Sequence, residues 1–209
     1  MSEPTSRAEA VVRPISGVLH WTVHDDRIDF RSDAYAVETE SGLVLIDPLP
    51  LGDKPLQSLE TVVAICLTGG FHQRAAWSLR KRFDAPVYAP VGAQGLLDSP
   101  DASYDDSTSL PGALRALQKP GPTLPHYAFT WRTPAGDLAL FCADLLIREG
   151  SGPLRFVSDE HHDDPAQTRE SVRSLLELRA DHLLPAHGSP EIGNAGEAIR
   201  RALELDQKG

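Results

Sequence analysis

The sequence contains very little cysteine, methionine or aromatic residue, and no long apolar run. Two of its 209 residues are cysteine, one is methionine and 6% are aromatic. Cys66 and Cys142 both lie inside apolar, strand-like runs, which predicts buried, reduced thiols rather than a disulfide or a catalytic nucleophile. No apolar run reaches the length of a membrane span, and residues 1–6 lack the regions of a signal peptide. These absences predict a cytoplasmic protein that does not act at a membrane.

Basic residues are also scarce, because 20 Lys and Arg stand against 30 Asp and Glu, for a formal charge of −10. This charge opposes binding to a phosphate backbone, so we expect no nucleic-acid partner. The sequence has neither a Gly-x-Ser-x-Gly elbow nor a Gly-x-x-x-x-Gly-Lys loop, which argues against a serine-hydrolase nucleophile and a nucleotide-binding loop of those types. The length predicts a single domain over residues 1–209, with residues 1–13 flexible.

Apolar strand-like segments alternate with amphipathic segments along the chain. Strands are expected at residues 15–23, 34–39, 43–46, 62–67, 86–89, 138–143 and 182–184. Helices are expected at residues 72–83, after Asp164, which is a good N-cap, and after Asn194. Residues 90–110 and the five-proline stretch 111–134 predict irregular chain and short strands. Strands with interleaved helices predict a layered α/β architecture with its site at strand ends.

Four segments, in order, carry a resemblance to a known family. They are the hairpin 34–47 ending in Leu-Ile-Asp-Pro, the corner 67–74, the strand end 141–144 with the letters Phe-Cys-Ala-Asp, and the late segment 184–188 with the letters Leu-Pro-Ala-His-Gly. With this order and spacing, nearly the whole chain resembles the metallo-β-lactamase superfamily. The resemblance implies an αββα sandwich, in which helices cover two stacked sheets, and a hydrolase-like activity on a dinuclear metal site.

The corner after residue 67 lacks the metal ligands of that family. The family carries His-x-His-x-Asp-His here, but the four ligand slots hold Gly69, Phe71, Gln73 and Arg74. None of these side chains is a good zinc ligand. The sequence therefore keeps the strand-loop-helix pattern of the first metal-binding motif but lacks its ligand side chains.

The later motifs are kept in part. Asp144 matches the bridging aspartate of the family and His187 matches its late histidine ligand, whereas Pro122 falls in the middle ligand slot. His126 matches a histidine that is not a ligand. Five of the seven expected ligands are therefore absent, and a dinuclear site that activates bridging water needs most of them.

One histidine could partly restore the site. His72 falls in a spacer slot of the degenerate motif, and we hypothesise that His72, Asp144 and His187 converge on one zinc or iron ion. In that case Arg74 would stabilise a developing oxyanion. Without a metal, Arg74 could instead form an ion pair with Asp144.

Two other clusters contain residue types that can form a site. Gly69 and Gly70 expose backbone N–H groups before a helix and Arg74 adds a cation, so this corner could cradle a phosphate or carboxylate. The run 159–164, which contains two histidines and four acids, is interpreted as a solvated capping loop rather than a metal site.

The leading interpretation is a hydrolase-like pseudoenzyme that has lost the dinuclear site, holds no cofactor, and binds an unknown small molecule or protein. The alternative is a mononuclear metal-dependent hydrolase of an ester, thioester or amide, with the metal on His72, Asp144 and His187 and with Asp144 and Arg74 as catalytic residues. Trp131 and the Pro-rich stretch 111–134 are candidates for the interface of a homo-oligomer.

Overall fold

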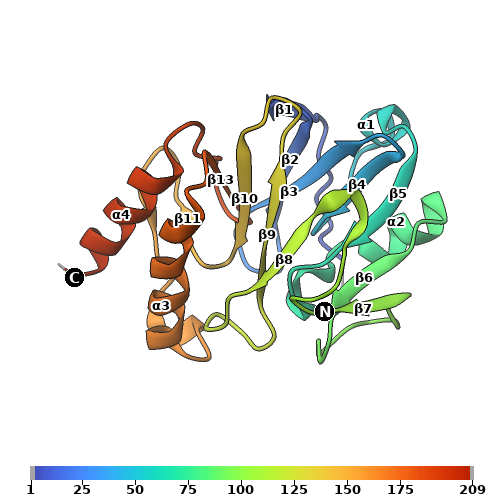
Figure 1. Cartoon of the computed structure of the whole chain (residues 1–209). Coiled ribbons are helices and arrows are strands. Elements are labelled where there is room, and N and C mark those ends of the chain that lie inside the picture. Colours follow the sequence, from blue (N-terminus) through green and yellow to red (C-terminus); the bar gives the residue numbers. More distant parts are fainter. Residues whose placement is uncertain (1–2, 208–209) are drawn as a thin grey trace.

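Two β-sheets stack face to face at the centre of the protein, and helices cover the outer face of each (Figure 1). The structure is a computed structural model that describes residues 3–207. The larger sheet has seven strands in chain order: β1 (Val12–Ile15), β2 (Val18–Asp25), β3 (Phe30–Thr39), β4 (Gly42–Ile46), β5 (Val62–Cys66), β6 (Val87–Pro90) and β7 (Ala102–Tyr104). Strands β1 to β4 are antiparallel, and β4 to β7 are parallel.

The smaller sheet brings together strands from the second half of the chain. Its order is β13 (His182–Pro185), β10 (Leu138–Ala143), β9 (Tyr127–Arg132) and β8 (Arg115–Gln118). β13 runs parallel to β10, whereas the other pairs are antiparallel. A separate two-stranded ribbon, β11 (Ile147–Arg148) and β12 (Leu154–Arg155), follows β10.

The helices lie on the two outer sides. They are α1 (Asp53–Ser58), α2 (Ala76–Phe83), α3 (Pro165–Leu175) and α4 (Ala195–Asp206), with the short 3-10 turns η1 (Gly70–Gln73), η2 (Pro111–Ala113), η3 (Asp159–His161) and η4 (Leu176–Leu178). None of the helices in residues 3–207 is long and apolar enough to cross a lipid bilayer.

Three apolar clusters separate the four layers. One joins the large sheet to α2 and includes Leu45 and Leu79. The second fills the space between the sheets and includes Tyr35 and Phe141. The third, which includes Val172, joins the small sheet to α3 and α4. Since each sheet is apolar on both faces, the layer order is helix, sheet, sheet, helix, and the expected αββα sandwich is confirmed.

Several local expectations are also confirmed, and one helix starts later than expected. Cys66 and Cys142 are buried free thiols, and the Asp164 carboxylate accepts the N–H of Gln167 at 2.9 Å to cap α3. The helix expected at residues 72–83 begins at Ala76, because Arg74 adopts φ +36° and separates η1 from α2. The sequence also gave no sign of α1, β7 or the β11–β12 ribbon.

The segment expected to be flexible contains defined structure within the described residues. Ala8 bridges to Leu51, with its N–H donating to the carbonyl of Pro50, and β1 begins at Val12. Residues 1–2 of that segment lie outside the described residues.

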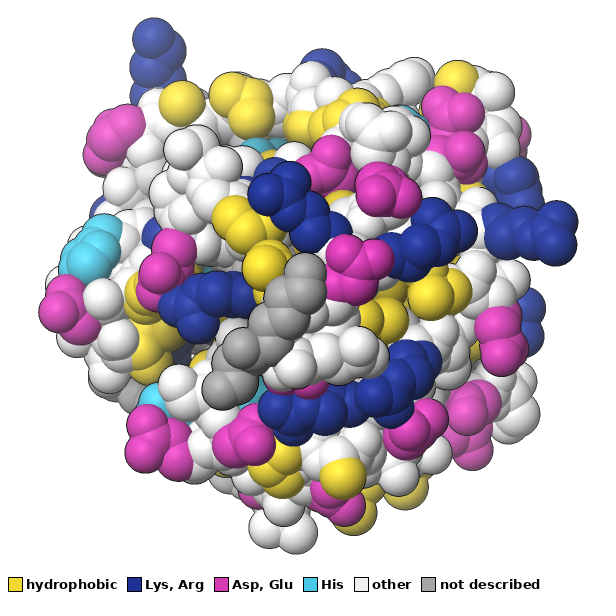
Figure 2. All heavy atoms as spheres, turned by 90° about the vertical axis from the view of Figure 1, so that its left-hand side faces the viewer, with side chains coloured by type: hydrophobic (Ala, Val, Ile, Leu, Met, Phe, Trp, Pro, Cys, Tyr) yellow, Lys and Arg dark blue, Asp and Glu magenta, His cyan; other side chains and the backbone are white. Residues whose placement is uncertain are grey.

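The face formed by α3 and α4 is highly charged, with basic and acidic side chains interspersed (Figure 2). Arg169 on α3 donates to the Asp206 carboxylate at the end of α4 at 2.8 Å and to Asp159 at 2.9 Å. This arginine therefore fastens α4 and the η3 turn to α3, which matters for the pocket described below.

Candidate metal centre

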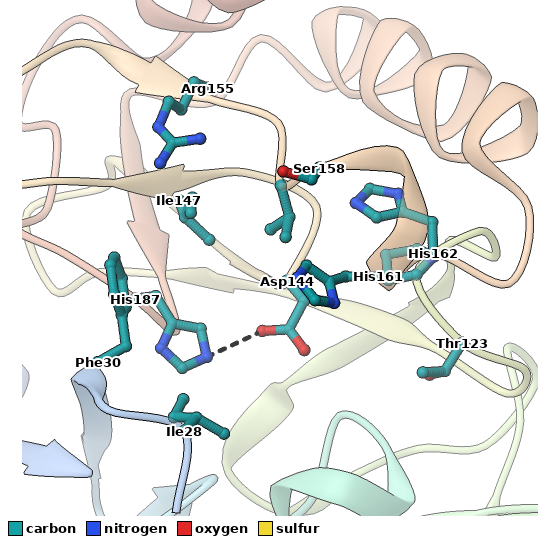
Figure 3. A pocket seen from close by; sticks show the side chains of 12 residues that line it. Ile28, Phe30, Thr123, Asp144, Ile147, Arg155, Ser158, His161, His162 and His187 are labelled. Carbon is teal, nitrogen blue, oxygen red and sulfur yellow. Dashed lines mark ion pairs between the residues drawn. The ribbon is translucent and has the colours of Figure 1, made fainter. Parts of the chain in front are cut away.

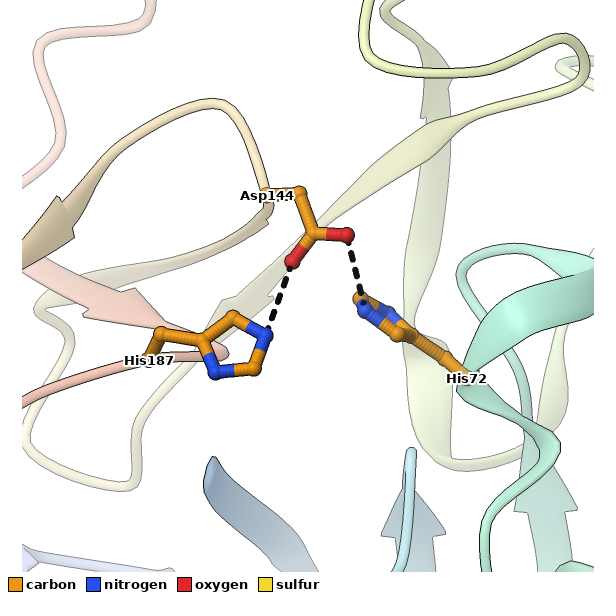
Figure 4. Close-up of side chains that lie close together, drawn as sticks. All are labelled: His72, Asp144 and His187. Carbon is orange, nitrogen blue, oxygen red and sulfur yellow. Dashed lines mark ion pairs between the residues drawn. The ribbon is translucent and has the colours of Figure 1, made fainter. Parts of the chain in front are cut away.

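Three side chains from distant parts of the sequence meet where strands end. His72 lies on η1, just after β5; Asp144 follows β10; and His187 follows β13. Because β10 and β13 are parallel neighbours, with Ala143 opposite Pro185, their carboxyl ends lie together. Figure 4 shows the three side chains pointing toward one another from separate segments.

The spacing of the three groups suits a single metal ion. The distance from His72 Nε2 to Asp144 Oδ2 is 3.0 Å, and that from His187 Nε2 to Asp144 Oδ1 is 3.3 Å. One ligand atom from each residue can be chosen so that all lie within 4.8 Å of one another. Two ligands on the same tetrahedral zinc lie about 3.3 Å apart, given metal–ligand distances of about 2.0 Å. The three residues expected to converge therefore do so.

The His72 ring is oriented by groups beneath it. Its Nδ1 lies 2.7 Å from Thr68 Oγ1 and 3.0 Å from Asp47 Oδ2. The backbone N–H and hydroxyl of Thr68 donate to the Asp47 carboxylate at 2.8 and 2.6 Å, which fixes that carboxylate. With Nδ1 donating toward Asp47, Nε2 is the nitrogen that faces Asp144, as in a carboxylate–histidine–metal arrangement.

The His187 ring is oriented by the backbone of β3. Its Nδ1 lies 2.8 Å from the carbonyl oxygen of Arg31, so this nitrogen donates and Nε2 is left facing Asp144. The next residue, Gly188, donates its N–H to Asp33 Oδ2 at 2.7 Å. Asp33 in turn accepts from the Arg31 guanidinium and pairs with His20 at 2.7 Å. In both imidazoles Nδ1 is therefore occupied by an acceptor and Nε2 faces Asp144, which is the orientation that metal-ligating histidines need.

Burial and charge act against each other at the centre. Burial disfavours the protonated imidazole, but the carboxylates of Asp144 and Asp47 outweigh it and raise the pKa of His72 to about 9. Burial also disfavours the Asp144 carboxylate, yet His72 and His187 hold its pKa well below the ordinary value. One oxygen, Asp144 Oδ1, is buried and makes no hydrogen bond of good geometry among the described residues, although His187 Nε2 lies 3.3 Å from it. A buried anionic oxygen that lacks a hydrogen bond is a position where a cation fits.

Two residues of the corner after β5, Gln73 and Phe71, have contacts or exposure of their own. The Gln73 side chain donates to the carbonyl of Gly95 and accepts from Trp77 and from the N–H of Leu97. Phe71 is 54% exposed. The Gln73 side chain therefore holds the loop at residues 95–97, and the Phe71 side chain faces solvent. Neither faces the cluster of His72, Asp144 and His187.

Arg74 also contacts the backbone rather than the cluster. It is buried, and its guanidinium donates to the carbonyls of Asp33 at 2.8 Å and Asp47 at 3.1 Å. Within residues 3–207, the ion-pair partners of Asp144 are His72 and His187, so the hypothesis of an Arg74–Asp144 ion pair is wrong.

The glycine corner lies apart from the pocket described next. Gly69 precedes η1 and is backed by Pro125 and Thr123, while a Cβ at Gly70 would overlap the carbonyl oxygen of Gln94. Neither glycine nor Arg74 lines that pocket. Anion binding at Gly69, Gly70 and Arg74 stays a prediction.

His126 supports the backbone of Asp144. Its Nδ1 donates to the carbonyl of Lys119 at 2.8 Å, and its Nε2 accepts the backbone N–H of Asp144 at 3.4 Å. Burial lowers the pKa of His126 to about 4, so the ring is neutral at pH 7. It lies outside the cluster of three ligand candidates.

A pocket of about 560 Å³ opens beside the cluster (Figure 3). Asp144 and His187 form part of its wall, and Pro122, in the middle ligand slot, lies in the same wall. Apolar side chains line much of the rest, namely Ile28, Phe30, Ile147 and Val157. An apolar pocket with a few polar groups at one end is the usual form of a small-molecule site.

The sequence interpretation missed two histidines of this pocket. His161 and His162 line it, together with Ser158 and Arg155 (Figure 3). The run 159–164 was interpreted as a solvated capping loop, which is right for Asp164 and wrong for His162. The position of the run in the sequence could have indicated this. It lies between the strand that ends at Asp144 and the start of the next helix, and loops that follow strand ends often carry site residues.

Comparison with known proteins identifies the fold. No protein-family model and no curated protein sequence matches the chain. Among solved structures, a metallo-beta-lactamase from Pontibacter korlensis aligns with a TM-score of 0.74 at 19% identity, covering 97% of this chain and 100% of that one. The metallo-beta-lactamase FIM-1 from Pseudomonas aeruginosa, in its mono-zinc form, aligns with a TM-score of 0.71 at 17% identity, covering 97% and 96%.

An archaeal superfamily protein from Sulfolobus tokodaii is also similar, with a TM-score of 0.69 at 16% identity, over 92% of this chain and 86% of that one. Together with the layer order, these likenesses show that the chain has the metallo-β-lactamase fold.

Proposed function

We propose that the chain is a mononuclear metal-dependent hydrolase, with one zinc or iron ion held by His72, Asp144 and His187. The observation that carries the proposal is the convergence of these three groups, with both imidazoles already presenting Nε2. Two histidines and one carboxylate, with further coordination positions open, are a ligand set used by catalytic zinc and by non-haem iron.

Two further features support a metal over a vacated site. Asp144 Oδ1 is a buried carboxylate oxygen that faces His187 Nε2 at 3.3 Å without a hydrogen bond of good geometry, and a cation bound by both atoms would satisfy it. Each imidazole also has an acceptor at Nδ1, Asp47 for His72 and the Arg31 carbonyl for His187, which is the support that metal-ligating histidines need. One structural neighbour, FIM-1, is described in a mono-zinc form, so a single-metal state has a precedent within this fold.

A metal at this position supplies a Lewis acid and a bound water of lowered pKa. The protein supplies orientation and a dry surrounding. Asp47 and the Arg31 carbonyl hold the two rings, and the apolar wall of Ile28, Phe30 and Ile147 would bind an apolar acyl group beside Asp144. The reaction that suits this arrangement is hydrolysis of an ester, thioester or amide. Arg74 has no part in this proposal, because it is buried against backbone carbonyls.

The test is the metal content of protein purified without a histidine tag, before and after supplementation with zinc or iron. We expect about one metal per chain, lost in His187→Ala and kept in His24→Ala. His24 is a matched control because it is an exposed histidine whose ion-pair partner within residues 3–207 is Asp29. An acyl-ester, thioester and amide screen then follows, in which activity should vanish on chelation and return with metal.

Failure to take up zinc or iron under any condition would overturn the proposal. The pocket would then belong to a metal-free binding protein, the leading interpretation of the sequence. In that case a small ligand should raise the melting temperature without added metal.

A further inference from the structure

His162 lines the pocket and has one buried nitrogen without a hydrogen-bond partner among the described residues. Its Nδ1 lies 2.8 Å from Thr168 Oγ1, and the Thr168 hydroxyl donates to the carbonyl of Asp164 at 3.0 Å. Because that hydroxyl proton is already used, Thr168 Oγ1 accepts from His162, and the imidazole proton is on Nδ1. Nε2 therefore carries a lone pair, and this atom is buried with no hydrogen-bond partner among the described residues.

The backbone around His162 is fixed from both sides. The N–H groups of Asp163 and Asp164 donate to the carbonyls of Pro122 and Gly121 at 3.2 and 2.9 Å. Asp164 caps α3, and Arg169 holds Asp159 at the start of η3. The ring is therefore held by the protein fold rather than left on a mobile loop.

His162 belongs to the pocket but not to the ligand cluster. It lines the same cavity as Asp144 and His187 (Figure 3), yet the group of three that could hold a metal does not include it. Burial lowers the pKa of His162, which is consistent with a neutral ring. Its neighbour His161 is exposed and lies 3.8 Å from Glu160, so it is a different kind of group.

We propose that His162 is a substrate-positioning residue whose Nε2 accepts a hydrogen bond from an amide N–H, so that the preferred substrates are amides with an apolar acyl group. The inference rests on the proposed function and narrows its three acyl classes to one. Of esters, thioesters and amides, only a primary or secondary amide carries a hydrogen-bond donor at the scissile group. A compound without a donor leaves a buried acceptor unsatisfied, which weakens binding by about tenfold or more.

The test uses the full chain without added metal, so that it does not depend on the metal site. The probes are hexanamide, which has an apolar tail and two N–H donors, and N,N-dimethylhexanamide, which has none. Nitrogen NMR of the labelled histidines should show His162 Nε2 as an unprotonated nitrogen. That resonance should move on addition of hexanamide and stay in place with the dimethyl compound, which should bind at least about tenfold more weakly.

Two substitutions separate this role from a structural one. The amide of His162→Gln reaches the place of Nε2 and can accept there, whereas that of His162→Asn reaches only the place of Nδ1 and can still donate to Thr168. The proposal predicts that the Gln variant keeps the preference for hexanamide and the Asn variant loses it. If the contact with Thr168 were what mattered, the Asn variant would be the one that retains it.

The other possible results of the binding and NMR measurements also support or overturn the role of His162. Equal affinity for the two probes, binding of neither, or a protonated Nε2 overturns it. So does an Nε2 resonance that responds to zinc alone, because His162 would then be a ligand. Conversely, a protein that takes up no metal but keeps the hexanamide preference would overturn the proposed function and leave the role of His162 standing.

Discussion

His72 Nδ1 lies 3.0 Å from Asp47 Oδ2 and 2.7 Å from Thr68 Oγ1, so acceptors below the ring leave Nε2 facing Asp144. Asp47 is itself fixed by the N–H and hydroxyl of Thr68. A histidine in what the family resemblance makes a spacer slot can therefore act as a ligand, because the strand end at Asp47 and the corner at Thr68 lie beneath it.

Replacing Asp47 tests this relationship. Asp47→Asn removes the charge that fixes the His72 tautomer, so we expect zinc affinity to fall by about 10- to 100-fold. The measurement is a competition titration against a chelator, with circular dichroism to confirm folding. Glu60→Gln, which removes an exposed acid, should leave the affinity unchanged. An affinity in Asp47→Asn equal to that of the parent would mean that the carboxylate does not support the site.

Gly188 fixes the chain after His187. It adopts φ +109°, and a Cβ there would overlap the carbonyl oxygen of Arg148. Gly193 has φ +82° but open space around it, so Gly193→Ala measures the backbone conformation alone, about 1 kcal/mol. Gly188→Ala should destabilise the protein by more than this and also reduce its metal content. Urea unfolding and elemental analysis of both variants test this, and equal losses of stability would rule out the close approach as the cause.

The fold was predictable because it depends on patterns spread over many residues. Three segments each match the family weakly: the hairpin at 34–47, the strand end at Asp144 and the segment around His187. Their order along the chain leaves few other folds possible. Convergence of the three ligands was only a hypothesis, since the gap between His72 and Asp144 depends on how the two sheets pack. The sequence does not predict that the Arg31 carbonyl is a partner of His187, because every residue type has the same backbone carbonyl.

Two other sequence predictions, the start of α2 and the interpretation of the run 159–164, were wrong for specific physical reasons. The later start of α2 follows from φ +36° at Arg74, a conformation that sequence patterns associate with glycine or asparagine rather than arginine. His162 was hidden because an acidic run before a helix is explained adequately by capping. The cap at Asp164 is real, and the same turn also carries the histidine into the pocket.

The Asp25 carboxylate gives the protein a pH-dependent stability. Burial disfavours its ionised form, but hydrogen bonds from Arg27, at 2.8 and 2.6 Å, outweigh this and lower the pKa of Asp25. A pKa lowered by folding stabilises the protein above the ordinary value of 3.8, and that stability is lost as the pH falls below it. Asp25→Asn should be less stable than the parent by about 2 kcal/mol near neutral pH. The difference should shrink below about pH 4, in urea unfolding followed from pH 7 to pH 3. A difference that does not depend on pH would exclude the charged pair as its source.

Arg74 is expected to act on stability. Its guanidinium satisfies the carbonyls of Asp33 and Asp47 in the interior, so Arg74→Met should destabilise the protein by about 2–3 kcal/mol. The control Arg82→Met, at an exposed arginine of α2, should change stability by less than about 0.5 kcal/mol. Thermal and urea unfolding supply the measurement. An Arg74→Met protein that is as stable as the parent but inactive would instead restore the oxyanion role suggested by the sequence.

The number of metal ions bound at saturation tests the proposed mononuclear site. A second ion would need ligands from the positions of Gly69, Phe71, Gln73, Arg74 and Pro122, which supply no imidazole or carboxylate. Titration with excess zinc, followed by dialysis and elemental analysis, should therefore level off at one ion per chain. His72→Ala should bring this close to zero rather than to an intermediate value, because the two groups left, Asp144 and His187, are too few to retain zinc. Retention of two ions per chain after dialysis would contradict the prediction, and it would require ligands outside the cluster, for which the nearby pocket histidines His161 and His162 are the first candidates.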